Sequence, residues 1–331
     1  MWNTWVELLS KLWVPTLRDV FKAKRVVSKY LPRTPLVYSR RLSRILGFNA
    51  YFKLENLQPT KAFKVRGGVY FVNVKKDEAL KRGLITASTG NHGQSIAYAA
   101  SLIGAKAVIV MPHGVPKVKV EALRDLGAEV VFYGRIYEEA REYAERLASK
   151  KGLLYVHGVN EPLLYAGVAT MHLENIEDLP NVDVIINPIG GGSGASGAVI
   201  VAKSVDPSIK VIGVQAEGAK SFYLSWKLGR LVATGVANTI AEGLATARAY
   251  ELPFKILKDK IDDIVLVRDD EIIRAVKIII KFLGQVVEPS GAAAMAATWK
   301  IRDMLRGKNV IIMVTGGNID PELLAKIMCA D

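Results

Sequence analysis

Short apolar runs alternate with longer segments of helical period along most of this chain, and this alternation constrains the fold more than any other feature. Several runs have apolar residues at consecutive positions, which is typical of strands that helices cover on both faces. The pattern predicts an α/β protein with mainly parallel sheets. The predicted strands are Tyr51–Glu55, Leu84–Ala87, Ala107–Met111, Glu129–Tyr133, Val182–Asn187, Val211–Gln215, Ile264–Val267 and Asn309–Val314, and the clearest predicted helices are Lys117–Leu126, Ile136–Ser149 and Glu271–Leu283.

A compact series of strand and helix repeats lies near residues 80–155, and its strands end at turn signals such as Pro112-His113-Gly114. After His157 the sequence predicts a long helix, followed by strand and helix units that are longer than those before it. We therefore expect two domains, with a smaller domain at residues 80–155 inserted in a larger one formed by residues 1–79 and 156–331.

Composition excludes several classes of protein. The 331 residues carry a net charge of +13 and a single cysteine, Cys329, so neither a disulfide scaffold nor a metal site is predicted. Basic residues alternate with acids, as in residues 135–142, which is typical of a solvated helix surface rather than a nucleic-acid interface. No uncharged apolar run approaches the roughly 20 residues that span a bilayer. We expect a cytoplasmic protein without nucleic-acid or membrane partners.

The N-terminus has an apolar face at helical spacing that includes Trp2, Trp5 and Trp13. This spacing predicts an N-terminal helix packed on the core or across a dimer interface.

Three glycine-rich turns each follow a predicted strand: Thr86–Gly93, Pro188–Gly197 and Val314–Asn318. Glycine lets backbone N–H groups approach a ligand, and the start of a helix adds unpaired donors and a positive dipole end. The middle turn is the best candidate for binding phosphate, because consecutive glycines form a concave nest of N–H donors. Its glycine spacing also matches a dinucleotide fingerprint, but the next strand ends without a clear ribose-binding acid, and the turn has no Walker lysine.

A lysine stands at the predicted start of a helix in the segment Lys61-Ala62-Phe63-Lys64-Val65-Arg66-Gly67-Gly68. A cation is unfavourable at a helix N-terminus, so a neutral amine or an imine is easier to hold at Lys64. Considered alone, the segment also allows another interpretation, in which Lys61, Lys64 and Arg66 are solvated cations on an exposed turn.

Together and in this order, these segments resemble the fold-type II family of pyridoxal-phosphate enzymes, and within it the serine/threonine dehydratase and serine racemase branch. The resemblance runs from about Arg33 to Pro321. It implies the two-domain fold of the tryptophan synthase β family, pyridoxal 5'-phosphate as cofactor, and Lys64 as its Schiff-base residue and the catalytic base. The cofactor-binding residues that it implies are Phe63, Lys64, Asn91, Gly190, Gly191, Gly192, Ser193, Gly194, Gly243, Glu288 and Thr315, and the substrate-binding residues are Ser88, Thr89, Gly90, Asn91 and His92.

The resemblance also implies a reaction, the conversion of L-threonine to 2-oxobutanoate and of L-serine to pyruvate, with release of ammonia. Thr89 stands where serine racemases carry a catalytic hydroxyl, so we expect slow serine racemisation as a side reaction. The alternatives are a serine racemase, a threonine synthase, a cysteine synthase-like enzyme and a binding protein without turnover. The synthases usually carry Ser and Asp where this chain has Ala62 and Val65. We expect a homodimer or a higher homo-oligomer.

Two departures from the family pattern limit what the resemblance implies. Ser193 and Gly194 stand where this branch commonly has a fourth glycine and an apolar residue, although a serine amide and hydroxyl can still donate to phosphate. The positions that match the cation site of serine racemases are Gln215, Ala219 and Ser221, which lack both carboxylates. We therefore predict no metal.

Overall fold

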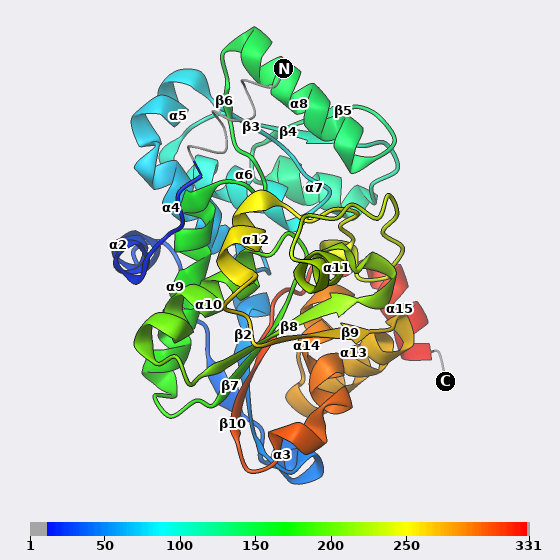
Figure 1. Ribbon diagram of the computed structural model, residues 1–331. Helices are drawn as coiled ribbons and strands as arrows, with labels where there is room; N and C mark the ends of the chain where they lie inside the picture. The colour runs from blue at the N-terminus through cyan, green and yellow to red at the C-terminus, as the bar shows by residue number, and fades with distance from the viewer. Residues whose placement is uncertain (1–11, 330–331) are drawn as a thin grey trace.

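The computed structural model describes residues 12–329 and contains two sheets, which Figure 1 shows at the bottom and the top of the molecule. The six-stranded sheet is made of β1 (Leu36–Tyr38), β2 (Asn49–Leu54), β7 (Val184–Pro188), β8 (Lys210–Ala216), β9 (Asp263–Val267) and β10 (Asn309–Val314). Its order is β1-β2-β10-β7-β8-β9, and every neighbouring pair is parallel except β1 with β2. The expected α/β fold with mainly parallel sheets is confirmed.

The smaller sheet has four parallel strands in the order β5-β4-β3-β6. They are β3 (Leu84–Ala87), β4 (Ala107–Met111), β5 (Glu129–Phe132) and β6 (Leu154–Tyr155). All four lie within residues 80–155, while the exact domain boundaries stay a prediction.

Helices cover both faces of the larger sheet, with α9 and α10 on one side in Figure 1 and α13 and α14 on the other. Alternate residues of β10 join different apolar cores, since Ile311 packs on the first side and Ile312 on the second. The helices are α2 (Leu17–Val27), α3 (Arg40–Leu46), α4 (Lys64–Val74), α5 (Lys76–Arg82), α6 (Asn91–Ile103), α7 (Lys117–Asp125), α8 (Tyr137–Lys151), α9 (Pro162–Asp178), α10 (Ser193–Val205), α11 (Ser221–Leu228), α12 (Glu251–Leu257), α13 (Asp269–Leu283), α14 (Pro289–Lys300) and α15 (Pro321–Cys329).

Helix α4 is held between α6 and α9 by very close backbone contacts. A Cβ atom at Gly68 would lie 2.3 Å from Ser95 Oγ of α6, and one at Gly167 of α9 would lie 2.5 Å from Arg66 O. Only glycine permits helices to approach so closely. This packing fixes the first residue of α4, which is Lys64.

The N-terminal helix predicted around Trp2 and Trp5 lies outside the described residues; Trp13 is described and is 42% exposed. Within residues 12–329, no helix is long and apolar enough to cross a membrane.

Candidate active site

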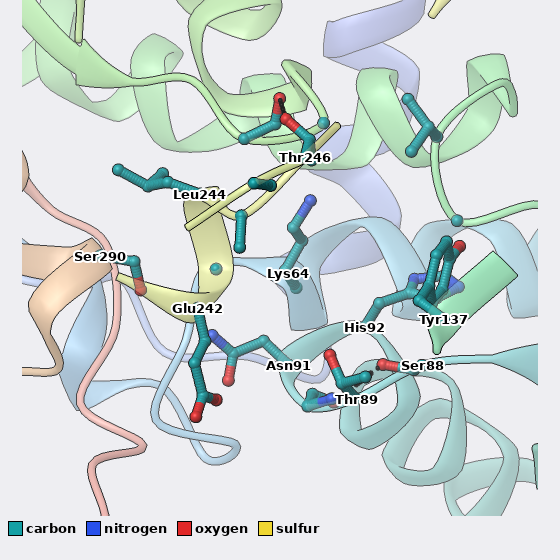
Figure 2. Close-up of a pocket in the computed structure, with 18 of the residues that line it drawn as sticks. Lys64, Ser88, Thr89, Asn91, His92, Tyr137, Glu242, Leu244, Thr246 and Ser290 are labelled. Carbon is teal, nitrogen blue, oxygen red and sulfur yellow. Dashed lines mark hydrogen bonds between the residues drawn. The ribbon is translucent and has the colours of Figure 1, made fainter. Parts of the chain in front are cut away.

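A cavity of about 700 Å³ lies where loops that follow β3, β4, β7 and β10 meet, so both sheets contribute to it (Figure 2). Carboxyl ends of parallel strands are the usual position of ligand sites in α/β proteins. Every residue that the resemblance implies for cofactor or substrate lines this cavity: Phe63, Lys64, Ser88, Thr89, Gly90, Asn91, His92, Gly190, Gly191, Gly192, Ser193, Gly194, Gly243, Glu288 and Thr315. Residues far apart in the sequence are in contact here, such as Asn91 and Asn318, which are 227 positions apart.

Lys64 projects into the cavity between the loop that carries Thr246 and the loop that carries Thr89 (Figure 2). Its Nζ donates a hydrogen bond to Ser193 Oγ at 3.0 Å and lies 5.1 Å from the centre of the Phe63 ring. Burial lowers the pKa of Lys64 to about 8. An amine with this pKa is neutral often enough to act as a nucleophile or a base near neutral pH.

The backbone before Lys64 is fixed to the loop that carries Thr315. Phe63 N donates to Thr315 O at 3.1 Å, and Gly317 N donates to Lys61 O at 2.8 Å. Lys61 takes a positive φ of 54°, which costs on the order of 1 kcal/mol in a residue with a side chain. The pairing holds the Thr315 hydroxyl and the Lys64 amine in one cavity.

Arg66 does not belong to a solvated turn, because its side chain is only 1% exposed. It forms a two-bond contact with Glu55, at 2.8 and 2.7 Å, and a second ion pair with Glu174 at 2.8 Å. Burial alone would raise the pKa of Glu55, but the Arg66 guanidinium lowers it below its usual range. The interpretation of this segment as three exposed cations is therefore wrong, and the buried pairs fix the first turn of α4.

The turn predicted to bind phosphate opens directly into α10. Gly192 precedes the helix with a φ of +90°, where residues with side chains are strained, and a Cβ atom there would lie 2.6 Å from Pro253 Cβ. A Cβ atom at Gly190 would lie 2.2 Å from Gly243 O. The N–H groups at the start of α10 and the Ser193 hydroxyl thus border the cavity together, which is the donor set that a phosphate monoester requires.

A chain of hydrogen bonds orients the side chain of Asn91. Asn318 Nδ2 donates to Asn91 Oδ1 at 2.7 Å, and Asn91 Nδ2 donates to Glu288 Oε1 at 2.7 Å. Burial raises the pKa of Glu288 to about 7, although the bond from Asn91 opposes this rise. The second N–H of Asn91 can therefore donate to a ligand while its amide stays fixed.

The loop from Ser88 to His92 lies below Lys64 in Figure 2. Ser88 Oγ accepts from Gly93 N at 2.9 Å and from Gly90 N at 3.1 Å, so its hydroxyl is engaged in shaping the loop. His92 Nε2 lies 2.9 Å from Thr86 Oγ1, and burial lowers the pKa of His92 to about 3, which keeps it neutral. Thr89 lines the cavity beside them.

Several residues that line the cavity were not predicted. Asn318 is the last residue of the third glycine-rich turn, and its amide next to a glycine pair was the signal that could have identified it. Lys119 and Glu242 form an ion pair between α7 and the short helix Glu242–Leu244, and no local motif marks either residue. Tyr137, Thr246 and Tyr250 also line the cavity without such a signal.

The positions compared with a cation site are engaged in other contacts. Gln215 Oε1 accepts from Tyr223 N at 2.8 Å, and Ser221 Oγ donates to Thr246 O at 2.9 Å. Among residues 12–329, no group of three or more His, Cys, Asp or Glu side chains is placed to hold a metal ion.

Known proteins resemble this chain in sequence and in structure. A family described as pyridoxal-phosphate dependent enzyme matches residues 27–316. L-threonine ammonia-lyase of Thermotoga maritima is 40% identical over 313 residues, which cover 95% of this chain and 78% of that protein. L-threo-3-hydroxyaspartate ammonia-lyase of Saccharomyces cerevisiae is 34% identical, covering 95% and 97%. Maize serine racemase superimposes with a TM-score of 0.90 at 31% identity, covering 96% and 97%, and threonine deaminase isoform 2 of Solanum lycopersicum with 0.89 at 32%, covering 95% and 94%.

Proposed function

The chain belongs to the family of pyridoxal-phosphate-dependent enzymes, and we propose that within this family it is an ammonia-lyase that acts on L-threonine and L-serine. The products are 2-oxobutanoate or pyruvate, with ammonia; water is lost in the elimination and consumed again in the release of ammonia. The observation that carries the proposal is the Lys64 amine, held 3.0 Å from Ser193 of the glycine-rich turn predicted to bind phosphate, in a cavity that the hydroxyl residue Thr315 also lines. The identity to a threonine ammonia-lyase supports it.

The cavity has a suitable residue for each functional group of pyridoxal phosphate. The start of α10 and the Ser193 hydroxyl would hold the phosphate, Lys64 would hold the aldehyde carbon, and the fixed amide of Asn91 would donate to the phenolic oxygen. Phe63 would pack against the ring, and Thr315 would face the ring nitrogen. A neutral hydroxyl there does not force the nitrogen to be protonated, whereas a carboxylate would.

Bound pyridoxal phosphate supplies an electron-withdrawing system that makes the Cα–H bond of an amino acid acidic. Lys64 then removes the Cα proton. With a pKa of about 8, roughly one Lys64 amine in ten is neutral at pH 7. The hydrogen bond from Nζ to Ser193 Oγ orients the amine, and Thr89 lies in the same cavity as a hydroxyl that could return a proton to Cα.

Backbone N–H groups of the loop from Ser88 to His92 would bind the substrate carboxylate. The loop leads into α6, whose first turn adds N–H donors and the positive end of its dipole. Because the Ser88 hydroxyl is already bonded to Gly90 and Gly93, we assign it the role of shaping this loop. His92, which is neutral and hydrogen-bonded to Thr86, lines the cavity and supports this loop.

The test is a product analysis of the holoenzyme with L-threonine, L-serine, and O-acetylserine plus sulfide. We expect 2-oxobutanoate and pyruvate from the first two and no cysteine from the third. Cysteine as the main product would overturn the proposal in favour of a cysteine synthase-like enzyme. Chiral chromatography of the serine reaction also tests Thr89: we expect slow D-serine formation, which Thr89→Ala should lower more than pyruvate formation. Absence of D-serine, or equal loss of both products, would remove the role proposed for Thr89.

We also propose that the protein is a homodimer or a higher homo-oligomer of the cytoplasm. Self-association would cover some of the exposed apolar side chains, among which are Met304 at 69% and Val286 at 51% exposure. The exposed thiol of Cys329 suits a reducing compartment. Light scattering during gel filtration measures the assembly, and a monomer at micromolar concentration would contradict it.

A further inference from the structure

Three fully buried polar side chains form a cluster next to the glycine-rich turn Pro188–Gly197, which is the candidate for binding phosphate. They are His172 and Asn175 of α9 and Asn187 of β7, each 0% exposed. None of the three lines the cavity, so none contacts a ligand there. Polar groups are costly to bury unless they are hydrogen-bonded, so a cluster of three in this position requires an explanation.

We propose that this His172 cluster positions the first turn of α10 and thereby sets the affinity for the cofactor phosphate. His172 Nε2 lies 3.1 Å from Gly194 O, the carbonyl of the second residue of α10. A carbonyl oxygen only accepts, so Nε2 carries the proton and donates it. Asn175 Nδ2 donates to His172 Nδ1 at 3.3 Å, which requires Nδ1 to be unprotonated. Both bonds specify the same neutral tautomer, and burial lowers the pKa of His172 to about 3, so the ring stays neutral.

Asn187 completes the cluster and fills the space beside Gly194. Its amide lies 3.2 Å from His172 Nε2, and a Cβ atom at Gly194 would lie 2.6 Å from an atom of that amide. Asn187 Oδ1 has no hydrogen-bond partner in the present orientation; turning the amide over places this oxygen toward the Nε2 proton, which it then shares with Gly194 O. The Asn187 amide therefore leaves room only for glycine at position 194.

This arrangement gives a physical reason why Gly194 stands where this branch of the family commonly has an apolar residue. An apolar side chain at position 194 would occupy the volume that the Asn187 amide fills. The preceding residue, Ser193, borders the cavity and accepts the hydrogen bond from Lys64 Nζ at 3.0 Å. A shift of the first turn of α10 would therefore move the phosphate donors and the partner of Lys64 together.

His172 acts here as a positioning residue, and two variants of similar length separate its hydrogen bond from its volume. His172→Gln keeps a side-chain N–H that can donate to Gly194 O, whereas His172→Met fills the same space without a donor. The measurement is the dissociation constant of pyridoxal phosphate, titrated into the cofactor-free variants. The ³¹P chemical shift of the bound cofactor is recorded alongside it.

We expect His172→Met to weaken cofactor binding about tenfold and to shift the ³¹P resonance, while His172→Gln stays within about threefold of the parent with an unchanged resonance. Equal affinities and equal resonances in the two variants would overturn the proposal. If the Met variant does not fold, Gly194→Ala provides the second test. It should weaken binding by pressing on the Asn187 amide, and adding Asn187→Ala should restore affinity. No restoration would equally count against the cluster. The inference rests on family membership and not on the proposed substrate, so a different product leaves it intact.

Discussion

The carboxyl of Glu288 lines the cavity and accepts a hydrogen bond of 2.7 Å from Asn91, in surroundings that raise its pKa to about 7. Its ordinary pKa in an unfolded chain is close to 4.5. The folded protein therefore binds a proton at Glu288 more tightly than the unfolded chain does. Protonation of this group stabilises the fold at low pH, and that stabilisation is lost as the pH rises from about 4.5 to about 7.

Glu288→Gln removes this titration while keeping an oxygen to accept from Asn91. We expect the free energy of unfolding of the variant, relative to the parent, to increase by up to about 3 kcal/mol between pH 4.5 and pH 7.5. Urea unfolding of both cofactor-free proteins at several pH values measures this difference. A difference that is independent of pH would show that Glu288 titrates normally.

At the scale of elements, the turn into α10 depends on the positive φ of Gly192 and on its contact with Pro253. Gly192→Ala should strain the turn by about 1–3 kcal/mol and weaken cofactor binding by at least roughly fivefold, because the N–H donors move. Gly229 provides a matched control, since it also has a positive φ, of 65°, but nothing lies within 4 Å of its Cβ position.

Gly229→Ala should lower the free energy of unfolding by about 1 kcal/mol and leave the cofactor affinity unchanged. Denaturant unfolding and cofactor titration of the two variants separate the effects. Similar cofactor affinities in both would show that the geometry of the Gly192 turn does not matter for binding.

The elements that the sequence predicts best are strands buried on both faces. The run Ile311-Ile312-Met313 is apolar at every position because alternate residues enter different cores, and β10 begins and ends as predicted. Strands β1 and β6 were missed, since they have three and two residues and carry too little pattern. Their pairing depends on neighbours that only the folded chain brings together.

The site residues likewise divide into those that have a local signal in the sequence and those that only the folded chain brings together. Glycine turns and a lysine at a helix start have local causes, so Lys64 and Gly190–Gly194 could be predicted from the sequence. Asn187 and His172 meet only because α9 packs against α10, which itself packs on β7, and the sequence around each residue gives no sign of this contact. Lys119 and Glu242 are likewise paired by the tertiary structure alone.

At the scale of the whole molecule, that Lys119–Glu242 ion pair joins the part built on the smaller sheet to the part built on the larger one, at the cavity. The Lys119 side chain is 12% exposed and that of Glu242 is 57% exposed, so solvent and salt screen the pair. We expect Lys119→Gln to raise KM for L-threonine roughly threefold, the equivalent of about 0.6 kcal/mol, and to leave kcat nearly unchanged.

Salt provides the control for this prediction. Raising the ionic strength should increase KM of the parent toward that of the variant and should change the variant less. The double variant Lys119→Glu with Glu242→Lys should recover most of the loss. Steady-state kinetics at two salt concentrations measure all three proteins, and an unchanged KM in Lys119→Gln would show that the pair does not favour the substrate-bound arrangement.

The central claim is that Lys64 carries the cofactor and performs the proton transfer in elimination. Borohydride reduction of the holoenzyme, followed by peptide mapping, tests it most directly when L-threonine turnover is measured in the same sample. We predict a pyridoxyl group on Lys64 alone, with neighbouring Lys61 unmodified, and loss of 2-oxobutanoate formation in proportion to the label. A label on another lysine, or turnover that survives complete reduction, would contradict the account.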